Sequence, residues 1–144
     1  MKVIFIVGPT ASGKSKLAID LCLFLKKHAQ ENSQSLAINS KNPTPYYIVN
    51  ADSIQLYQEL DIGSAKPTPE EQSLVPHLLF DQVKPLDEVT AGKYEKWFFA
   101  TLAQLPPESL VFVVGGTGFY FQALEKGMFE IGSSNEQVKE QVEQ

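Results

Sequence analysis

The sequence has 144 residues, of which 43% are hydrophobic and 20% are charged, and this composition is that of one ordinary globular domain. Its single cysteine, Cys22, excludes a disulfide framework and is expected to be a buried helix thiol in a reducing compartment. No apolar run is long enough to cross a membrane, and the first apolar stretch is too short for a signal peptide. We therefore predict a cytoplasmic monomer that does not bind membranes.

Charge is unevenly distributed along the chain. The first 52 residues contain six lysines and three acidic residues, whereas the remainder contains six lysines and fourteen acidic residues. The net charge is −5, and all twelve basic residues are lysine. Proteins that bind phosphates or RNA usually use arginine for bidentate contacts, so this composition predicts that the chain offers only part of such a site.

The first predicted strand, residues 2–7, is continuously apolar, as expected of a buried strand in a parallel sheet. It leads into G-x-x-x-x-G-K-S, and a helix-like pattern follows, which is the context of a P-loop. The glycines let backbone amides turn toward phosphate oxygens, the lysine adds positive charge, and the Ser15 hydroxyl is placed to hold Mg²⁺. The predicted phosphate-binding residues are Gly8, Pro9, Thr10, Ala11, Ser12, Gly13, Lys14 and Ser15.

A helix is predicted from about residue 14 to residue 28, because leucine and phenylalanine side chains recur on one face. Residues 30–45 are rich in Asn, Ser, Gln and Pro and are predicted to form a long surface loop. Residues 46–50 form the second predicted strand, and Asp52 follows at its carboxyl end.

Prolines punctuate residues 67–76, which are predicted as an acidic loop, and residues 77–81 are a candidate third strand. Residues 94–105 carry an aromatic stripe at helical spacing, which predicts a helix that faces the core. A strongly apolar strand at 110–114 then leads into G-G-T-G, and a helix is predicted near residues 119–126.

Strands that alternate with helices predict an α/β fold of P-loop NTPase type, with a parallel sheet and helices on both faces. We expect residues 1–132 to form this core and residues 133–144 to form a polar tail. Ligands of such sheets bind beyond the carboxyl ends of the strands. That rule gathers the P-loop, the segment at Asp52 and the glycine-rich segment 115–118 into one predicted crevice.

Four side chains near this crevice allow either a functional or a structural interpretation. Asp52 could accept a proton from a nucleophile or could cap the next helix, and spacing alone does not separate these roles. Thr117 could contact a ligand, although a structural turn is the simpler interpretation. Asp81 follows a short apolar run, as does the aspartate that binds Mg²⁺ in P-loop proteins. Lys66 could reach a phosphate, although a solvated lysine is the default interpretation. Both histidines are isolated in sequence, so no zinc site is predicted.

Five motifs then follow in order across residues 3–127. After the P-loop come N-A-D-S-I-Q-L-Y at 50–57, L-D-I-G-S-A-K-P at 60–67, P-H-L-L at 76–79 and V-G-G-T-G-F-Y at 114–120. Together they resemble the tRNA dimethylallyltransferase (tRNA isopentenyltransferase) family. The string D-I-G-S-A-K-P in particular has no general explanation among P-loop proteins.

Members of that family transfer a dimethylallyl group from dimethylallyl diphosphate to the exocyclic amine of an adenine beside the tRNA anticodon. The resemblance implies that residues 10–15 hold the diphosphate and that Ser15 holds Mg²⁺. It implies two catalytic residues, with Asp52 as the general base and Thr117 as a contact of the target adenosine. The tRNA-binding residues implied by the resemblance are Asp52, Ser53, Ile54, Gln55, Thr117 and Lys139.

The sequence departs from the family in two respects. Its loop at residues 30–45 is longer, and family members continue into a helical insertion that grips the anticodon stem and into an arginine-bearing second half. We expect residues 133–144 to begin that insertion and the chain to be a partial form. Two other functions stay open, a P-loop small-molecule kinase in which Asp52 activates a hydroxyl, and a non-catalytic phosphate-binding fragment.

Overall fold

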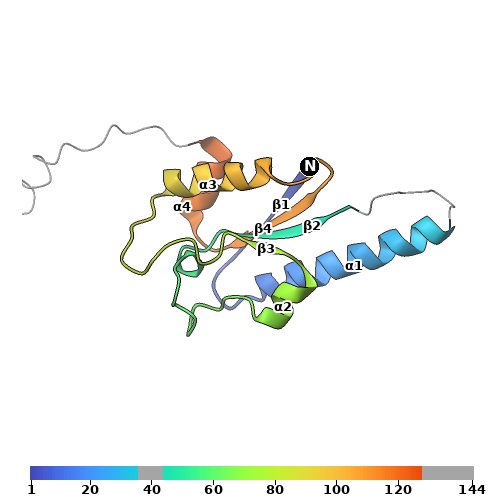
Figure 1. Ribbon diagram of the computed structural model, residues 1–144, viewed down its shortest axis with the longest axis horizontal. Helices are drawn as coiled ribbons and strands as arrows, with labels where there is room; N and C mark the ends of the chain where they lie inside the picture. Colours follow the sequence, from blue (N-terminus) through green and yellow to red (C-terminus); the bar gives the residue numbers. More distant parts are fainter. Residues whose placement is uncertain (36–43, 128–144) are drawn as a thin grey trace, which may run out of the picture.

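The computed structural model describes residues 1–35 and 44–127, in which strands and helices alternate along the chain (Figure 1). The strands are β1 (Lys2–Val7), β2 (Tyr46–Asn50), β3 (His77–Leu78) and β4 (Leu110–Gly115). The helices are α1 (Lys14–Ser35), α2 (Pro69–Leu74), α3 (Ala91–Ala103) and α4 (Gly118–Lys126), and a 3-10 turn, η1 (Ile54–Leu56), follows β2. The expected tail at residues 133–144 lies outside the described residues.

The strands form one sheet in the order β1-β4-β2-β3, and every pair in it is parallel. β4 is central, because it pairs with β1 along its whole length and with β2 from Leu110 to Val114. Helices α1 and α2 lie on one side of the sheet, whereas α3 and α4 lie on the other (Figure 1). This arrangement confirms the predicted α/β fold with helices on both faces.

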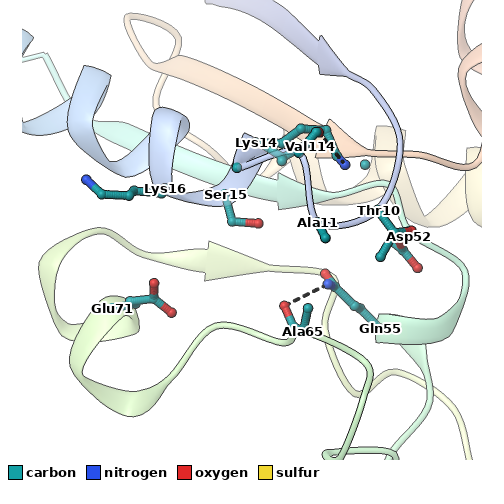
Figure 2. A pocket seen from close by; sticks show the side chains of 13 residues that line it. Thr10, Ala11, Lys14, Ser15, Lys16, Asp52, Gln55, Ala65, Glu71 and Val114 are labelled. Carbon is teal, nitrogen blue, oxygen red and sulfur yellow. Dashed lines mark hydrogen bonds between the residues drawn. The ribbon is translucent and has the colours of Figure 1, made fainter.

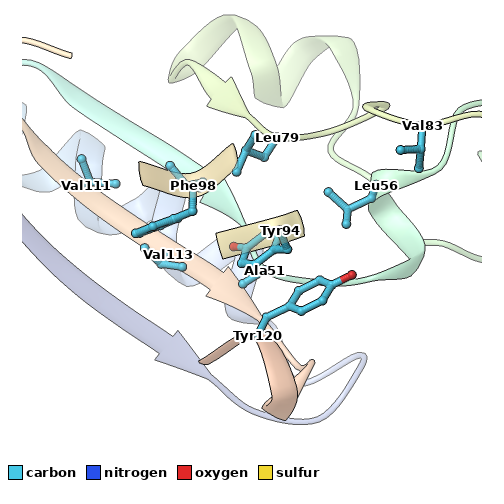
Figure 3. Close-up of a cluster of buried hydrophobic side chains, with 10 residues drawn as sticks. Ala51, Leu56, Leu79, Val83, Tyr94, Phe98, Val111, Val113 and Tyr120 are labelled. Carbon is cyan, nitrogen blue, oxygen red and sulfur yellow. The ribbon is translucent and has the colours of Figure 1, made fainter. Parts of the chain in front are cut away.

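Two apolar clusters hold these layers together, one on each face of the sheet. On one face, Tyr94 and Phe98 of α3 and Tyr120 of α4 pack against Val111 and Val113 of β4 (Figure 3). On the other face, α1 packs against β2 and β4, and Cys22 lies in this cluster with 1% of its surface exposed. Burial raises the pKa of the Cys22 thiol to about 11, as expected for an inert core cysteine.

The prediction that residues 2–7 form a buried strand is wrong for β1. Ile4, Phe5 and Val7 are 43%, 47% and 57% exposed, whereas the similarly apolar β4 is almost fully buried from Val111 to Val114. The cause is position in the sheet. Within the described residues, β1 pairs with β4 alone and is therefore an edge strand.

Three boundaries also differ from the predictions. α1 continues to Ser35, so residues 30–35 are helical where a loop was expected, while residues 36–43 lie outside the described part. Within the expected acidic loop, α2 begins behind a capping box in which Thr68 and Glu71 satisfy each other's backbone amides, with Pro69 in the first turn. β3 contains only two of the five expected residues, because Leu79 and Asp81 adopt positive φ angles of 61° and 54° that end it.

Among the described residues, no helix has both the length and the apolarity needed to cross a lipid bilayer.

Candidate active site

A pocket of about 280 Å³ lies beyond the carboxyl end of the sheet, where the sequence predicted a crevice (Figure 2). It brings together the P-loop, the segment after β2, the end of β4 and the loop before α2. The lining residues are Thr10, Ala11, Ser12, Gly13, Lys14, Ser15, Lys16, Asp52, Gln55, Ala65, Glu71, Val114 and Gly115.

The P-loop turns sharply between β1 and α1. Gly13 has a φ angle of 80°, which glycine adopts without steric cost, and Ala11 is held at 62°, which is unusual for a residue with a Cβ atom. The amide of Leu17 donates to the Gly13 carbonyl over 2.9 Å, so the loop runs directly into the first turn of α1. The Lys14 ammonium donates to the Pro9 carbonyl over 2.5 Å and thus lies within the loop. This combination of amides, helix end and ammonium is suited to an anion.

Gly115 joins the P-loop side of the site to the Asp52 side. A Cβ atom at this position would lie 2.1 Å from the Ala51 carbonyl oxygen, so the ends of β4 and β2 can approach this closely only at a glycine. The Gly8 amide also donates to the Gly115 carbonyl over 3.4 Å. The first glycine of G-G-T-G is therefore required by packing between backbones, independently of any ligand.

Asp52 is positioned mainly through its own backbone. The fully buried Asn50 side chain donates to the Asp52 carbonyl over 3.0 Å and accepts from the Asp52 amide over 2.9 Å. The Asp52 carboxylate accepts the Ile54 amide through Oδ1 over 3.0 Å, and this is its only hydrogen bond within the described residues. Ser53, rather than Asp52, is the N-cap residue of η1. Asp52 thus supports the turn with one oxygen while it lines the pocket.

Tyr94 supports this arrangement from the core. Its hydroxyl donates to the Asn50 carbonyl over 2.7 Å, and its ring stacks on that of Tyr120 at a centroid distance of 4.0 Å (Figure 3). Burial raises the pKa of the Tyr94 phenol far above its ordinary value, so the group stays a neutral donor. The aromatic stripe is core, as predicted, but one of its members also holds the end of β2.

Thr117 and Ser53 link the two loops behind the pocket. The Ser53 amide donates to Thr117 Oγ1 over 2.9 Å, and the two hydroxyl oxygens lie 3.3 Å apart. Thr117 is the N-cap residue of α4 but makes no side-chain capping bond, because its hydroxyl is used in this link. Neither side chain lines the pocket, and Ile54 is 51% exposed outside it. Of the implied tRNA-binding residues, only Asp52 and Gln55 lie at the pocket, and Lys139 lies outside the described residues.

The wall opposite the P-loop comes from the loop 57–68 and from α2. Gln55 donates to the Ser64 and Ala65 carbonyls over 2.9 Å each, and Figure 2 shows Gln55 and Ala65 across the pocket from Ala11. Lys66 and Asp81, both considered as ligands of phosphate or metal, do not line the pocket. They pair with each other instead, over 2.6 Å.

Sequence reasoning missed Asn50, Tyr94 and Glu71. A polar residue closing an apolar strand could have identified Asn50, because such a residue is buried only when its hydrogen bonds are satisfied. The capping pattern T-P-E-E could have placed Glu71 on a helix rather than in a loop. The hydrogen bond of Tyr94 spans 44 positions and leaves no local signal.

The donor atoms at the pocket fit Mg²⁺ bound together with a phosphate ligand. Ser15, Asp52 and Glu71 offer the hard oxygen donors that Mg²⁺ prefers. No cluster of three or more His, Cys, Asp or Glu side chains suitable for a metal occurs in the described ranges. The ion would therefore need oxygens from a phosphate and from water, as Mg²⁺ usually does.

Comparison with known proteins identifies the family of this chain. A family model described as IPP transferase matches residues 55–144, which is more than half of the chain. The chain belongs to the IPP transferase family. Its relatives include the tRNA dimethylallyltransferase of Bdellovibrio bacteriovorus, 51% identical over 129 residues that make up 90% of this chain and 36% of that protein. The enzyme of the same name from Koribacter versatilis is 39% identical over 94% of this chain and 38% of its own length.

Solved structures of this IPP transferase family share the fold. The full-length tRNA isopentenylpyrophosphate transferase of Bacillus halodurans matches with a TM-score of 0.67 and 30% identity, over 99% of this chain and 41% of that one. A eukaryotic dimethylallyltransferase solved while acting on tRNA matches with a TM-score of 0.66 at 23% identity, which supports the fold alone. The chain thus spans a little more than one third of the length of the curated relatives quoted above.

Proposed function

We propose that this chain carries the diphosphate-binding and base-bearing part of a tRNA dimethylallyltransferase. Such an enzyme transfers a dimethylallyl group from dimethylallyl diphosphate to the exocyclic amine of an adenine next to the anticodon. The observation that carries the proposal is the meeting of residues 10–15 and Asp52 at one pocket, in a chain whose relatives bear this name. A cytoplasmic location and a monomeric state remain predictions.

The proposed chemistry begins at the P-loop. The bond between the allylic carbon and the diphosphate oxygen breaks, and the oxygen keeps the electron pair. Backbone amides of residues 10–15 and the Lys14 ammonium would stabilise the negative charge that develops on the leaving diphosphate. The Ser15 hydroxyl would help to hold Mg²⁺, which when bound would supply further neutralisation of the same charge.

Asp52 would act on the other side of the reacting carbon. As the adenine amine forms its bond to that carbon, the nitrogen becomes cationic and must lose a proton. The Asp52 carboxylate would orient the amine and accept this proton, since one of its oxygens is not used by the η1 turn. The adenine would have to leave its stack to reach the pocket, as in other enzymes that modify bases.

The tRNA side of the proposal rests on the implied residues. Asp52 and Gln55 would face the target nucleotide from the pocket, while Ser53, Ile54 and Thr117 would contact the tRNA from the linked loops beside it. Thr117 is proposed as a contact of the target adenosine, and the Ser53 amide that it binds would hold it in place. Lys139 is proposed as a further tRNA contact.

The first test of this function is ligand binding at the P-loop. Lys14→Ala should weaken the binding of dimethylallyl diphosphate with Mg²⁺ by about 1.5–3 kcal/mol, because it removes a charge-assisted contact. Isothermal titration calorimetry measures this difference, with Lys96→Ala on the exposed side of α3 as a control for lost charge. Equal affinities for the wild type and Lys14→Ala would refute a P-loop diphosphate site. A clear preference for ATP in competition would favour the kinase instead.

A further inference from the structure

Lys66 has a largely covered side chain and takes part in two ion pairs. Its side chain is only 10% exposed, although lysine is rarely buried unless it is paired. Its ammonium donates to Asp81 Oδ1 over 2.6 Å and to Asp61 Oδ1 over 2.9 Å. Burial alone would lower the pKa of this ammonium, but the two carboxylates outweigh burial and raise it above the ordinary value. The lysine is therefore a charged, doubly paired group rather than a solvated one.

These contacts cross from one loop to another. Asp61 and Lys66 belong to the loop 57–68, whereas Asp81 follows β3. Asp81 is itself attached to the segment after β2, because its amide donates to the Gln55 carbonyl over 3.2 Å and its carbonyl accepts from Gln58 over 2.9 Å. Gln55 in turn holds the Ser64 and Ala65 carbonyls. The loop is thus fastened at Lys66 on one side and by Gln55 on the pocket side.

The backbone of this loop requires such fastening. Glu59, Gly63 and Ala65 have φ angles of 64°, 77° and 52°, and conformations of this kind persist in residues with a Cβ only where the surroundings hold them. Ala65 lines the pocket and the adjoining Lys66 does not. The side chain that could have been a phosphate ligand is directed to two carboxylates, and its neighbour forms the pocket wall.

We propose that Lys66 is a positioning residue, which uses its ion pairs with Asp61 and Asp81 to hold the Ala65 wall of the pocket at a fixed distance from the P-loop. The effect of Lys66 on ligand affinity rests on the proposed function, because a diphosphate is taken as the ligand of the pocket. The effect of Lys66 on the loop itself does not depend on the proposed function. The lysine of D-I-G-S-A-K-P would thus serve through its ion pairs rather than through contact with a phosphate.

Removing the carboxylate partner separates this role from direct phosphate contact. Asp81→Asn deletes a negative charge near the pocket, so electrostatics alone predict tighter binding of an anion. A direct phosphate lysine, released from its competitor, would also bind more tightly. The positioning role predicts the opposite, about tenfold weaker binding, because the loop loses its fixed geometry. Asparagine tolerates the positive φ angle at this position, so the backbone need not change.

The experiment uses the full 144-residue chain and its Lys66→Met, Lys66→Arg and Asp81→Asn variants, with Lys84→Met as an exposed control. Amide hydrogen exchange of residues 57–66 should be faster in Lys66→Met and Asp81→Asn than in the wild type, Lys66→Arg and Lys84→Met. The affinity for inorganic pyrophosphate with Mg²⁺, measured by calorimetry, should fall about tenfold in the same two variants and recover in Lys66→Arg.

Each outcome decides the proposal. Unchanged exchange in Lys66→Met and Asp81→Asn overturns the fastening of the loop. Faster exchange with unchanged pyrophosphate affinity overturns the link to the pocket, and tighter binding by Asp81→Asn overturns the positioning role. A wild-type chain that binds no pyrophosphate refutes the diphosphate site of the proposed function, while the exchange data still decide whether Lys66 holds the loop.

Discussion

Asp52 has one carboxylate oxygen engaged in the η1 turn, and this allows its structural and chemical roles to be separated. Asp52→Asn keeps an oxygen that can accept the Ile54 amide, but it removes the ability to take up a proton. Asp52→Ala would remove both, so its effect would not distinguish a helix cap from a general base. If Asp52 is only structural, Asp52→Asn should be harmless. If Asp52 is the general base, Asp52→Asn should lose activity while it keeps the fold.

We expect Asp→Asn at the position matching Asp52, in a full-length relative, to lower turnover by about 10²–10⁴ while leaving the melting temperature nearly unchanged. The reason is that the proton of the attacking amine would lose its acceptor while the turn keeps its hydrogen bond. Steady-state assays with dimethylallyl diphosphate and unmodified tRNA measure the first quantity, and thermal unfolding measures the second. Normal turnover in this variant would leave the aspartate with its structural role alone.

At the scale of single elements, His77 of β3 should make the stability of the folded chain depend on pH. His77 Nδ1 lies 2.7 Å from the Val75 carbonyl and must donate to it, so neutral His77 has an unprotonated Nε2, which is buried without a partner. Burial lowers the pKa of His77 below its ordinary value of 6.5, because a second proton would be placed at this buried nitrogen. The unfolded chain accepts that proton more readily than the folded one.

The folded chain should therefore lose stability as the pH falls below about 6.5 and should continue to lose it down through the lowered pKa of folded His77. Urea unfolding at pH 7.5, 6.0 and 5.0 measures this slope. His77→Gln should flatten the part of the slope due to this residue, whereas His28→Gln should not, since His28 is exposed on α1. Parallel slopes in the wild type and His77→Gln would contradict this account.

The elements differ in how far the sequence could predict them. β2, β4 and the P-loop were predicted closely, because apolar periodicity and a fixed motif are local signals. The edge position of β1 depends on which strands lie beside it, and residues 2–7 carry no information on that. The same limit applies at the site, where the partners of Lys66 lie 5 and 15 positions away and its role could not be inferred.

On the scale of the whole molecule, the net negative charge of the chain limits the tRNA binding expected of it. RNA affinity depends largely on cations that neutralise backbone phosphates, and this chain has a net charge of −5 and no arginine. Under the proposed function the pocket would bind a diphosphate through its own groups, but an adenine would need positioning contacts that a chain of this charge provides only weakly. Orientation of reactants can account for roughly 7–11 kcal/mol of a barrier, so its loss is severe.

The 144-residue chain alone should therefore bind tRNA weakly even at low salt and should show little or no transfer. Gel shifts with unmodified tRNA and a transfer assay, run beside a full-length relative, test both statements. Tight tRNA binding together with normal turnover by these residues would refute the expectation that binding and transfer need groups outside them.

The central place of β4 also has a consequence for the order of folding. Among the described strands, β1 and β2 do not pair with each other, and they are aligned with one another only through β4, which pairs Lys2 with Leu110 and Asn50 with Val114. Such pairings between distant parts of a chain form slowly, and during synthesis the amino-terminal segments emerge first. Before residues 110–115 have emerged from the ribosome, a nascent chain would contain the P-loop and Asp52 but would lack the strand that aligns them. The phosphate-binding motif, complete within the first fifteen residues, would then become a pocket only after β4 has inserted between the two earlier strands.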